Sequence, residues 1–246
     1  MLKSKRVIIT GGGSGFGQAL VIELAKEGAI VEFTARKLED IEKTCSIVAA
    51  NQGVSHGYLC NLNNTESINE FVSKVSKSER AIDVLILNAT QWLSGTLEEQ
   101  TDQEIINTID SGLTGSIILT RALLPKIRAS SQPDIISIVS ACAIPNFTDS
   151  IAHPAFFASK HGMSGFITKI AQELKKDNVR VTALYPPDFE LRAFDEIENE
   201  QVKMGEKLLN AKSIWETIRF ILSQPRSCHI GSVYFEGPTR EDLAQP

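Results

Sequence analysis

The chain has 246 residues, of which 42% are hydrophobic and 22% charged, and its formal net charge at pH 7 is −5. This composition is typical of a soluble globular protein, and the negative charge argues against a surface that neutralises nucleic-acid phosphates. No apolar run approaches the ~20 residues that a membrane-spanning helix requires. We therefore expect one domain over residues 1–246 that binds neither nucleic acid nor membrane.

The first half of the chain alternates short β-branched runs with amphipathic segments. The runs at 6–10, 29–35, 54–59 and 82–87 predict strands, and apolar residues at three- and four-residue spacing predict helices at 16–28, 38–53 and 65–77. The second half predicts a helix near 101–128, a strand at 134–140, a helix at 154–176, a strand at 179–185, a helix at 213–222 and a strand at 229–236. This rhythm indicates an α/β fold, a Rossmann-type doubly wound parallel sheet of about seven strands with helices on both faces.

The stretch near residues 188–210 differs from the rest of the second half. It is polar, follows a prolyl break and mixes many acids with Phe189, Leu191 and Phe194. We expect a mobile helical flap there, which would shape an apolar pocket under a polar lid.

The cysteines and the N-terminus indicate the compartment. Cys45, Cys60, Cys142 and Cys228 show no C-x-x-C spacing, and the N-terminal residues pass straight into a predicted strand. We expect a cytoplasmic protein with reduced thiols, and we assign no metal site.

The segment ITGGGSGFGQAL joins the first predicted strand to the first predicted helix. Gly11 lets the chain turn sharply off the strand, while Gly15 and Gly17 leave room for a pyrophosphate and for helix packing. The helix that follows offers free N–H groups to negative charge. We interpret the segment as a dinucleotide-binding turn, and a purely structural turn is the alternative.

The end of the second predicted strand bears on the choice of dinucleotide. Ala35 offers no carboxylate to the ribose hydroxyls, whereas Arg36 and Lys37 offer two cations suited to a 2′-phosphate. This pattern favours NADP(H) over NAD(H), with Glu39 or Asp40 as an alternative ribose ligand.

Several motifs in a fixed order resemble those of the short-chain dehydrogenase/reductase family. The matches, collinear from residue 1 to about residue 237, are Thr10, Gly11, Gly15 and Gly17 of the glycine turn, Asn88, Ala89 and Thr90 for Asn-Ala-Gly, Ser140 for the active-site serine, Lys160 for the lysine of Tyr-x-x-x-Lys, and Pro186 after the sixth strand. The resemblance implies cofactor contacts from Gly11, Ser14, Gly15, Phe16, Gly17, Arg36, Lys37, Asn61, Leu62, Asn88, Ala89, Lys160, Pro186 and Phe189. It further implies a small-molecule substrate, an oxidoreductase activity in which Ser140 holds a carbonyl, and a homodimer or homotetramer.

Two active-site residues of that family pattern are replaced in this chain. Phe156 stands four residues before Lys160, at the tyrosine position, and Gly112 stands at the asparagine position. Phenylalanine has no proton to give, and positioned acid–base catalysis typically contributes ~10²–10⁴-fold. The sequence thus predicts an oxidoreductase with a degenerate active site; the alternative is a catalytically inactive dinucleotide-binding regulatory or scaffold protein. Lys160, His153 and Tyr185 remain open as replacement acids.

Overall fold

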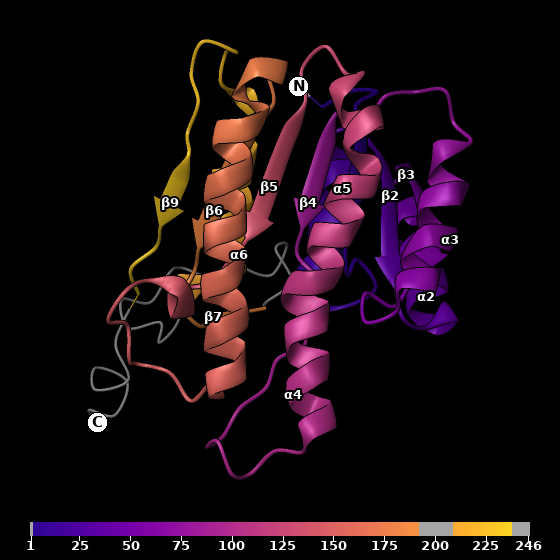
Figure 1. The fold of residues 1–246 in the computed structure, drawn as a ribbon. Helices are drawn as coiled ribbons and strands as arrows, with labels where there is room; N and C mark the ends of the chain where they lie inside the picture. The colour runs from indigo at the N-terminus through magenta and orange to yellow at the C-terminus, as the bar shows by residue number, and fades with distance from the viewer. Residues whose placement is uncertain (1, 192–208, 238–246) are drawn as a thin grey trace, which may run out of the picture.

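The computed structural model describes residues 2–191 and 209–237. Its main sheet has seven strands in the order β3-β2-β1-β4-β5-β6-β9, and every neighbouring pair is parallel (Figure 1). The order reverses between β1 and β4, so this pair forms the topological switch point of a doubly wound sheet. The predicted fold class is confirmed.

The elements follow the predicted alternation. The sheet strands are β1 Arg6–Ile9, β2 Ile30–Ala35, β3 Val54–Leu59, β4 Val84–Leu87, β5 Asp134–Ile138, β6 Arg180–Tyr185 and β9 Ser232–Tyr234. The helices are α1 Gly15–Lys26, α2 Leu38–Ala50, α3 Thr65–Ser76, α4 Asp102–Ile109, α5 Gly115–Arg128, α6 Pro154–Glu173 and α8 Ala211–Ser223. Two short strands, β7 Phe189–Glu190 and β8 Leu209–Asn210, pair with each other.

Each face of the sheet is covered by helices because its strands are apolar on both sides. Val7 and Ile9 pack with α1, α2 and α8 in one core cluster, whereas Ile8 between them packs with α3, α5 and α6 in the other. This alternation is the side-chain period of a strand, and it places one hydrophobic layer on each face. None of the helices described is long and apolar enough to cross a membrane.

The structure differs from the predicted elements at both ends of the expected helical flap, where β7 and β8 are short strands, and in two further places. The helix expected near 101–128 is interrupted by a π-helical segment at Asp110–Thr114, between α4 and α5. The last strand, expected at 229–236, has three residues and lies at the edge of the sheet. Helical spacing continues through a π-helical turn almost unchanged, so the sequence pattern gave no sign of the interruption.

Gly115 begins α5 at the point where this helix touches the chain after β3. A Cβ there would lie 2.2 Å from the carbonyl oxygen of Leu62. The glycine therefore permits the close approach of α5 to the segment that follows β3.

We predict that Gly115→Ala lowers the free energy of unfolding by about 1–3 kcal/mol, because a backbone carbonyl must shift to admit the methyl group. Gly165 in α6 is the matched control, since no atom lies within 4 Å of the position of its Cβ. Gly165→Ala should be neutral or raise stability by up to about 1 kcal/mol, as alanine favours a helix. Urea denaturation of both variants checks the pair, and equal effects would contradict the packing argument.

Candidate active site

The glycine turn between β1 and α1 is shaped for the close approach of a ligand. Gly11 and Gly15 have φ angles of +71° and +56°, in the left-handed region that favours glycine. A Cβ at Gly17 would lie 2.0 Å from the carbonyl oxygen of Gly11, so the helix packs on the turn only without a side chain there. Ser14 is exposed at the N-cap and does not use its hydroxyl to cap α1. The first N–H groups of α1 are therefore available to an anion.

Residues at the end of β4 hold this turn in place. The backbone N–H groups of Asn88 and Ala89 donate to the Thr10 hydroxyl, at 2.9 and 3.0 Å. The Asn88 amide also donates to the carbonyl oxygen of Thr10 at 3.1 Å. Asn88 and Ala89, both expected at the cofactor, thus lie beside the glycine turn, and the Asn88 amide nitrogen serves to fix it.

A second pair of residues, which the sequence analysis missed, fixes the turn from the side of α2. The Gln18 amide donates to the Thr44 hydroxyl at 2.8 Å and to the carbonyl oxygen of Gly13 at 3.2 Å. Thr44 is fully buried. Thr44 could have been found from the sequence, since it is a polar residue on the apolar face of the amphipathic helix α2. A polar group in that position is buried only when it is hydrogen-bonded.

Arg36 and Lys37 follow the end of β2 at the rim of this turn. Both side chains are exposed, and neither has an ion pair within residues 2–191 and 209–237. Ala35 before them is buried, and a Cβ at Gly13 would lie 2.7 Å from the Ala35 Cβ. The two cations therefore stand next to the glycine turn with their charges available to a phosphate.

Asn61 and Leu62 follow the carboxyl end of β3. The Asn61 side chain is exposed, and its oxygen accepts a hydrogen bond from the Asn63 N–H at 3.1 Å. Leu62 is buried, and its carbonyl group lies against Gly115. Of these two predicted contacts, Asn61 offers a polar side chain at the surface and Leu62 offers only backbone.

Ser140 has an unusual backbone conformation at the end of β5. Its φ and ψ angles are 149° and 154°, in a region that is essentially restricted to glycine and costs a non-glycine residue about 1–3 kcal/mol. The Ser140 hydroxyl accepts a hydrogen bond from the Cys142 N–H at 3.1 Å, so its own hydrogen remains available. Strain of this kind persists where the surroundings enforce it and is frequent at functional sites.

Lys160 places a buried ammonium group near the same strand end. Its Nζ donates to the carbonyl oxygen of Ile138 at 3.3 Å, and the residue is 4% exposed. Burial lowers the pKa of Lys160 to about 8, and the nearby Cys142 acts in the opposite direction. An ammonium has three N–H donors, so a ligand at the end of β5 can take the donors that Ile138 leaves.

The ring of Phe156 lies beside this ammonium group. Lys160 Nζ is 5.3 Å from the ring centroid, within the range of a cation–π interaction. The other side of the ring meets Trp92, with centroids 4.8 Å apart and an interplanar angle of 72°. Phe156 is 4% exposed and packs with Cys142 and Ala152. The position therefore supplies an apolar contact and a π face, and no proton.

Gly112 and Thr90 are far apart in sequence and meet in the structure. A Cβ at Gly112 would lie 2.4 Å from the Ser159 hydroxyl and 3.0 Å from the Thr90 hydroxyl. The Ser159 hydroxyl is buried and has no hydrogen-bond partner within the described residues. These two hydroxyl groups occupy the space into which a side chain at position 112 would extend.

The chain after β6 folds back over the glycine turn. The Ala141 N–H donates to the carbonyl oxygen of Pro186 at 2.8 Å. The Phe189 and Phe16 rings meet edge to face, with centroids 5.3 Å apart. The expected flap near 188–210 lies mostly outside the described residues, and its two ends are joined by the pairing of β7 with β8.

The two alternative acids have structural partners. His153 is fully buried at the N-terminus of α6, where its Nδ1 accepts a hydrogen bond from the Ala155 N–H at 3.0 Å. The Tyr185 hydroxyl is 2.8 Å from the Ser164 hydroxyl, and its ring stacks on Tyr234. Burial raises the pKa of Tyr185. These contacts make His153 a helix cap and Tyr185 a packing group, while the buried Nε2 of His153 has no hydrogen-bond partner among the described residues.

Comparisons with known proteins agree with this geometry. The chain is 34% identical over 199 residues to 3-dehydrosphinganine reductase TSC10B of Arabidopsis thaliana, covering 79% of this chain and 58% of that protein. It is 27% identical over 226 residues to 3-ketodihydrosphingosine reductase of Bacteroides thetaiotaomicron, covering 91% and 78% of the two chains. The chain spans less than two thirds of the length of TSC10B and of 3-dehydrosphinganine reductase TSC10A of Arabidopsis thaliana, which it covers to 65%.

Solved structures show the same fold. A metagenomic short-chain oxidoreductase in complex with NADP superposes with a TM-score of 0.79 at 26% identity, covering 96% of this chain and 98% of the other. Levodione reductase superposes with a TM-score of 0.82 at 20% identity over the full length of both chains, which shows the fold alone. The family model described as short chain dehydrogenase matches residues 5–202. With the glycine turn, the strand order and this match in agreement, the chain belongs to the short chain dehydrogenase family.

Proposed function

We propose that the protein is an NADP(H)-dependent oxidoreductase whose active site works without an aromatic hydroxyl. The observation that carries this proposal is the position of the buried Lys160 ammonium. It donates a hydrogen bond to the carbonyl oxygen of Ile138, two residues before Ser140, and lies over the ring of Phe156. Phe156 then occupies the tyrosine position and Gly112 the asparagine position of the family.

The donor groups around the glycine turn fit a dinucleotide. The uncapped N-terminus of α1 suits a pyrophosphate, and the exposed Arg36 and Lys37 suit the 2′-phosphate that distinguishes NADP(H) from NAD(H). The spare Lys160 donors suit ribose hydroxyls. The NADP complex of the metagenomic relative supports this assignment. When bound, the reduced dinucleotide supplies the hydride.

The protein's own residues then act on the substrate oxygen. The Ser140 hydroxyl donates a hydrogen bond to the carbonyl, and Lys160 transfers a proton from Nζ to the oxygen as the carbonyl carbon receives the hydride. The carbonyl becomes a hydroxyl, and the neutral Lys160 amine regains a proton from water. Desolvation makes this ammonium more acidic than an ordinary lysine, with a pKa of about 8, which is a favourable range for an acid near neutral pH.

We further propose a ketone on a long apolar chain as the substrate class. The segment at 92–97 joins the segment at 150–153 through the bridge between Ser94 and Ala152 and a hydrogen bond from the Gly95 N–H to the Ile151 carbonyl. Three large apolar side chains on these segments are exposed, namely Trp92, Leu97 and Ile151. Trp92 contacts Phe156, so this apolar surface begins at the catalytic end. The plant and bacterial relatives, named 3-dehydrosphinganine reductase and 3-ketodihydrosphingosine reductase, support the same class.

The dinucleotide preference is tested with Arg36→Ala. Loss of a charge-assisted hydrogen bond to a 2′-phosphate should weaken NADPH binding about ten- to a hundredfold and leave NADH binding within about twofold. Nicotinamide fluorescence titrations measure both dissociation constants. The matched control is Lys43→Ala, which removes an exposed cation from α2, the helix that begins just after Lys37. This variant should change neither dissociation constant. Equal weakening of both dinucleotides in Arg36→Ala would contradict the assigned preference.

The proton donor is tested by the pH dependence of turnover with 3-ketodihydrosphingosine as the probe. Lys160 must be protonated to act as the acid, and a folded-state pKa of about 8 means that the acidic form is lost as pH rises through that value. We expect kcat/KM for ketone reduction to be level below pH 7 and to fall about tenfold per pH unit above about pH 9. Lys160→Met should abolish this dependence together with most of the activity. A profile in Lys160→Met that keeps the same descending limb would show that another group supplies the proton.

The degenerate position is tested with Phe156→Tyr, which returns a hydroxyl to the helix face of Lys160. We expect ketone reduction to rise by up to about 10²-fold, since positioned acids contribute at least that much. Phe157→Tyr, the neighbouring half-buried phenylalanine, is the control and should leave the rate unchanged. If Phe156→Tyr binds NADPH but neither it nor the parent protein reduces a ketone, the protein is a dinucleotide-binding protein without redox chemistry.

A further inference from the structure

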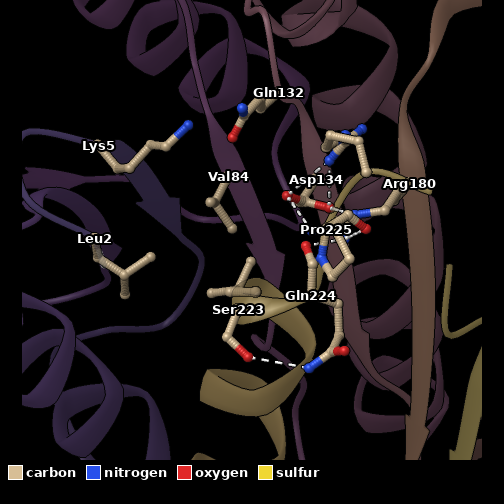
Figure 2. A pocket seen from close by; sticks show the side chains of 11 residues that line it. Leu2, Lys5, Val84, Gln132, Asp134, Arg180, Ser223, Gln224 and Pro225 are labelled. Atoms are coloured by element: carbon tan, nitrogen blue, oxygen red, sulfur yellow. Dashed lines mark hydrogen bonds and ion pairs between the residues drawn. The ribbon is translucent and has the colours of Figure 1, made fainter. Parts of the chain in front are cut away.

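A cavity of about 260 Å³ lies at the opposite end of the sheet from the glycine turn (Figure 2). It is lined by the starts of three strands, the N-terminal residues and the end of α8, through Leu2, Lys5, Val84, Gln132, Asp134, Arg180, Leu222, Ser223, Gln224, Pro225 and Arg226. Asp134 begins β5 and Ser140 follows its end. Six residues at about 3.3 Å each place the cavity roughly 20 Å from Ser140.

The charges that line this cavity do not balance. Two guanidinium groups share the Asp134 carboxylate: Arg180 donates through Nε at 2.6 Å and Nη2 at 3.1 Å, and Arg226 donates through Nη1 at 3.2 Å to each oxygen. Lys5 adds a third cation on the other side, as Figure 2 shows. Asp134 is the one carboxylate among the lining residues, so the lining carries a net positive charge.

Arg180 has a structural role that explains its burial. Besides Asp134, it donates through Nη1 to the carbonyl oxygens of Gln224 at 3.0 Å and Cys228 at 3.1 Å. It therefore ties the chain after α8 to the starts of β5 and β6. Its donors are used within the protein, and it forms a fixed wall of the cavity.

The remaining cations at the cavity use only part of their donors within the protein. Arg226 donates through Nη2 to the carbonyl oxygens of Pro133, at 3.1 Å, and Asn178, whereas its buried Nε has no hydrogen bond among the described residues. The Lys5 ammonium forms an ion pair with the Asp83 carboxylate at 3.7 Å, which is beyond hydrogen-bond distance. The Asp83 carboxylate already accepts from the Arg6 N–H at 2.9 Å and the Ser130 hydroxyl at 2.7 Å. Gln132, labelled in Figure 2, also lines the cavity.

Desolvation at the cavity wall agrees with this excess of positive charge. Burial lowers the pKa of the Arg226 guanidinium, Asp134 raises it, and the neighbouring Arg180 lowers it. A second anion beside Arg226 would relieve the repulsion between the two guanidinium groups.

We propose that this cavity binds a small oxyanion, with the size and charge of inorganic phosphate or of a short dicarboxylate, through Arg226, Lys5 and Gln132. Arginine and lysine are the residues that hold such groups, and the volume suits a ligand of a few heavy atoms. The site is separate from the dinucleotide site, so occupancy stabilises the fold at the amino ends of β4, β5 and β6 without competing for the glycine turn.

The experiment uses inorganic phosphate and malonate as probes at constant ionic strength, with the melting temperature as the readout, because a ligand that binds the native state stabilises it by mass action. The background is the double variant Arg36→Ala and Lys37→Ala, which removes the two cations expected to bind the 2′-phosphate at the dinucleotide site. We expect both probes to raise the melting temperature of this background. Lys5→Ala should weaken the apparent affinity about tenfold, and Lys3→Ala, an exposed cation two residues away, is the matched control.

Arg226→Gln should weaken the same affinity more strongly, and Gln132→Ala provides a further variant if Arg226→Gln does not fold. Stabilisation that vanishes in the Arg36 and Lys37 background would place the anion at the dinucleotide site and overturn the proposal. No stabilisation by either probe, or stabilisation unchanged in both Lys5→Ala and Gln132→Ala, would overturn it as well. These readouts do not depend on ketone reduction, so the proposal stands or falls independently of the proposed function.

Discussion

The Thr10 hydroxyl joins the two strand ends between which the candidate active site forms. It accepts from two successive backbone N–H groups of β4's continuation, at Asn88 and Ala89, and it is completely buried. A hydrogen bond in such surroundings is costly to lose, because each partner would remain buried and unpaired. The strand order reverses between β1 and β4, so a ligand crevice opens at the carboxyl ends of these two strands. The hydrogen bonds of Thr10 fix the distance between them. The hydrogen bonds of Thr10 therefore position the glycine turn, α1 and the segment after β6 that folds over them.

The fold and the conformation of the glycine turn were predictable because both depend on local patterns. Strand and helix alternation follows from hydrophobic spacing, and Gly11 and Gly15 are glycines because their backbone is left-handed. The contact between Thr90 and Gly112 was not predictable, since it joins two segments through a π-helical turn that leaves no mark in the spacing. The pairing of Trp92 with Phe156 is equally non-local. Sequence reasoning named Phe156 as a lost acid, and the structure adds that it is a buried packing residue.

The cavity at the amino ends of the strands lay outside any motif for the same reason. Lys5, Asp134, Arg180 and Arg226 come from four segments, and each is an ordinary charged residue beside a strand or helix end. Only the parallel register, which aligns Asp134 with Arg180, makes them one group. Parallel sheets gather strand starts at one edge and strand ends at the other, so a single sheet offers two polar edges with separate chemistry.

The ring of Phe156 has an effect on Lys160 beyond the absence of a hydroxyl group at this position. A buried ammonium with one carbonyl partner is expensive, and the π face of Phe156 offsets part of that cost, by up to about 2 kcal/mol for a desolvated pair. The ring lies against Trp92 and cannot easily turn away, so the ammonium is held at the end of β5 near the strained Ser140. A hydroxyl at this position would share the proton with Lys160, whereas the phenyl ring of Phe156 leaves the ammonium as the proton donor beside Ile138. On the proposed function, the substitution therefore moves the proton source from an aromatic side chain to the lysine beside it and retains the site.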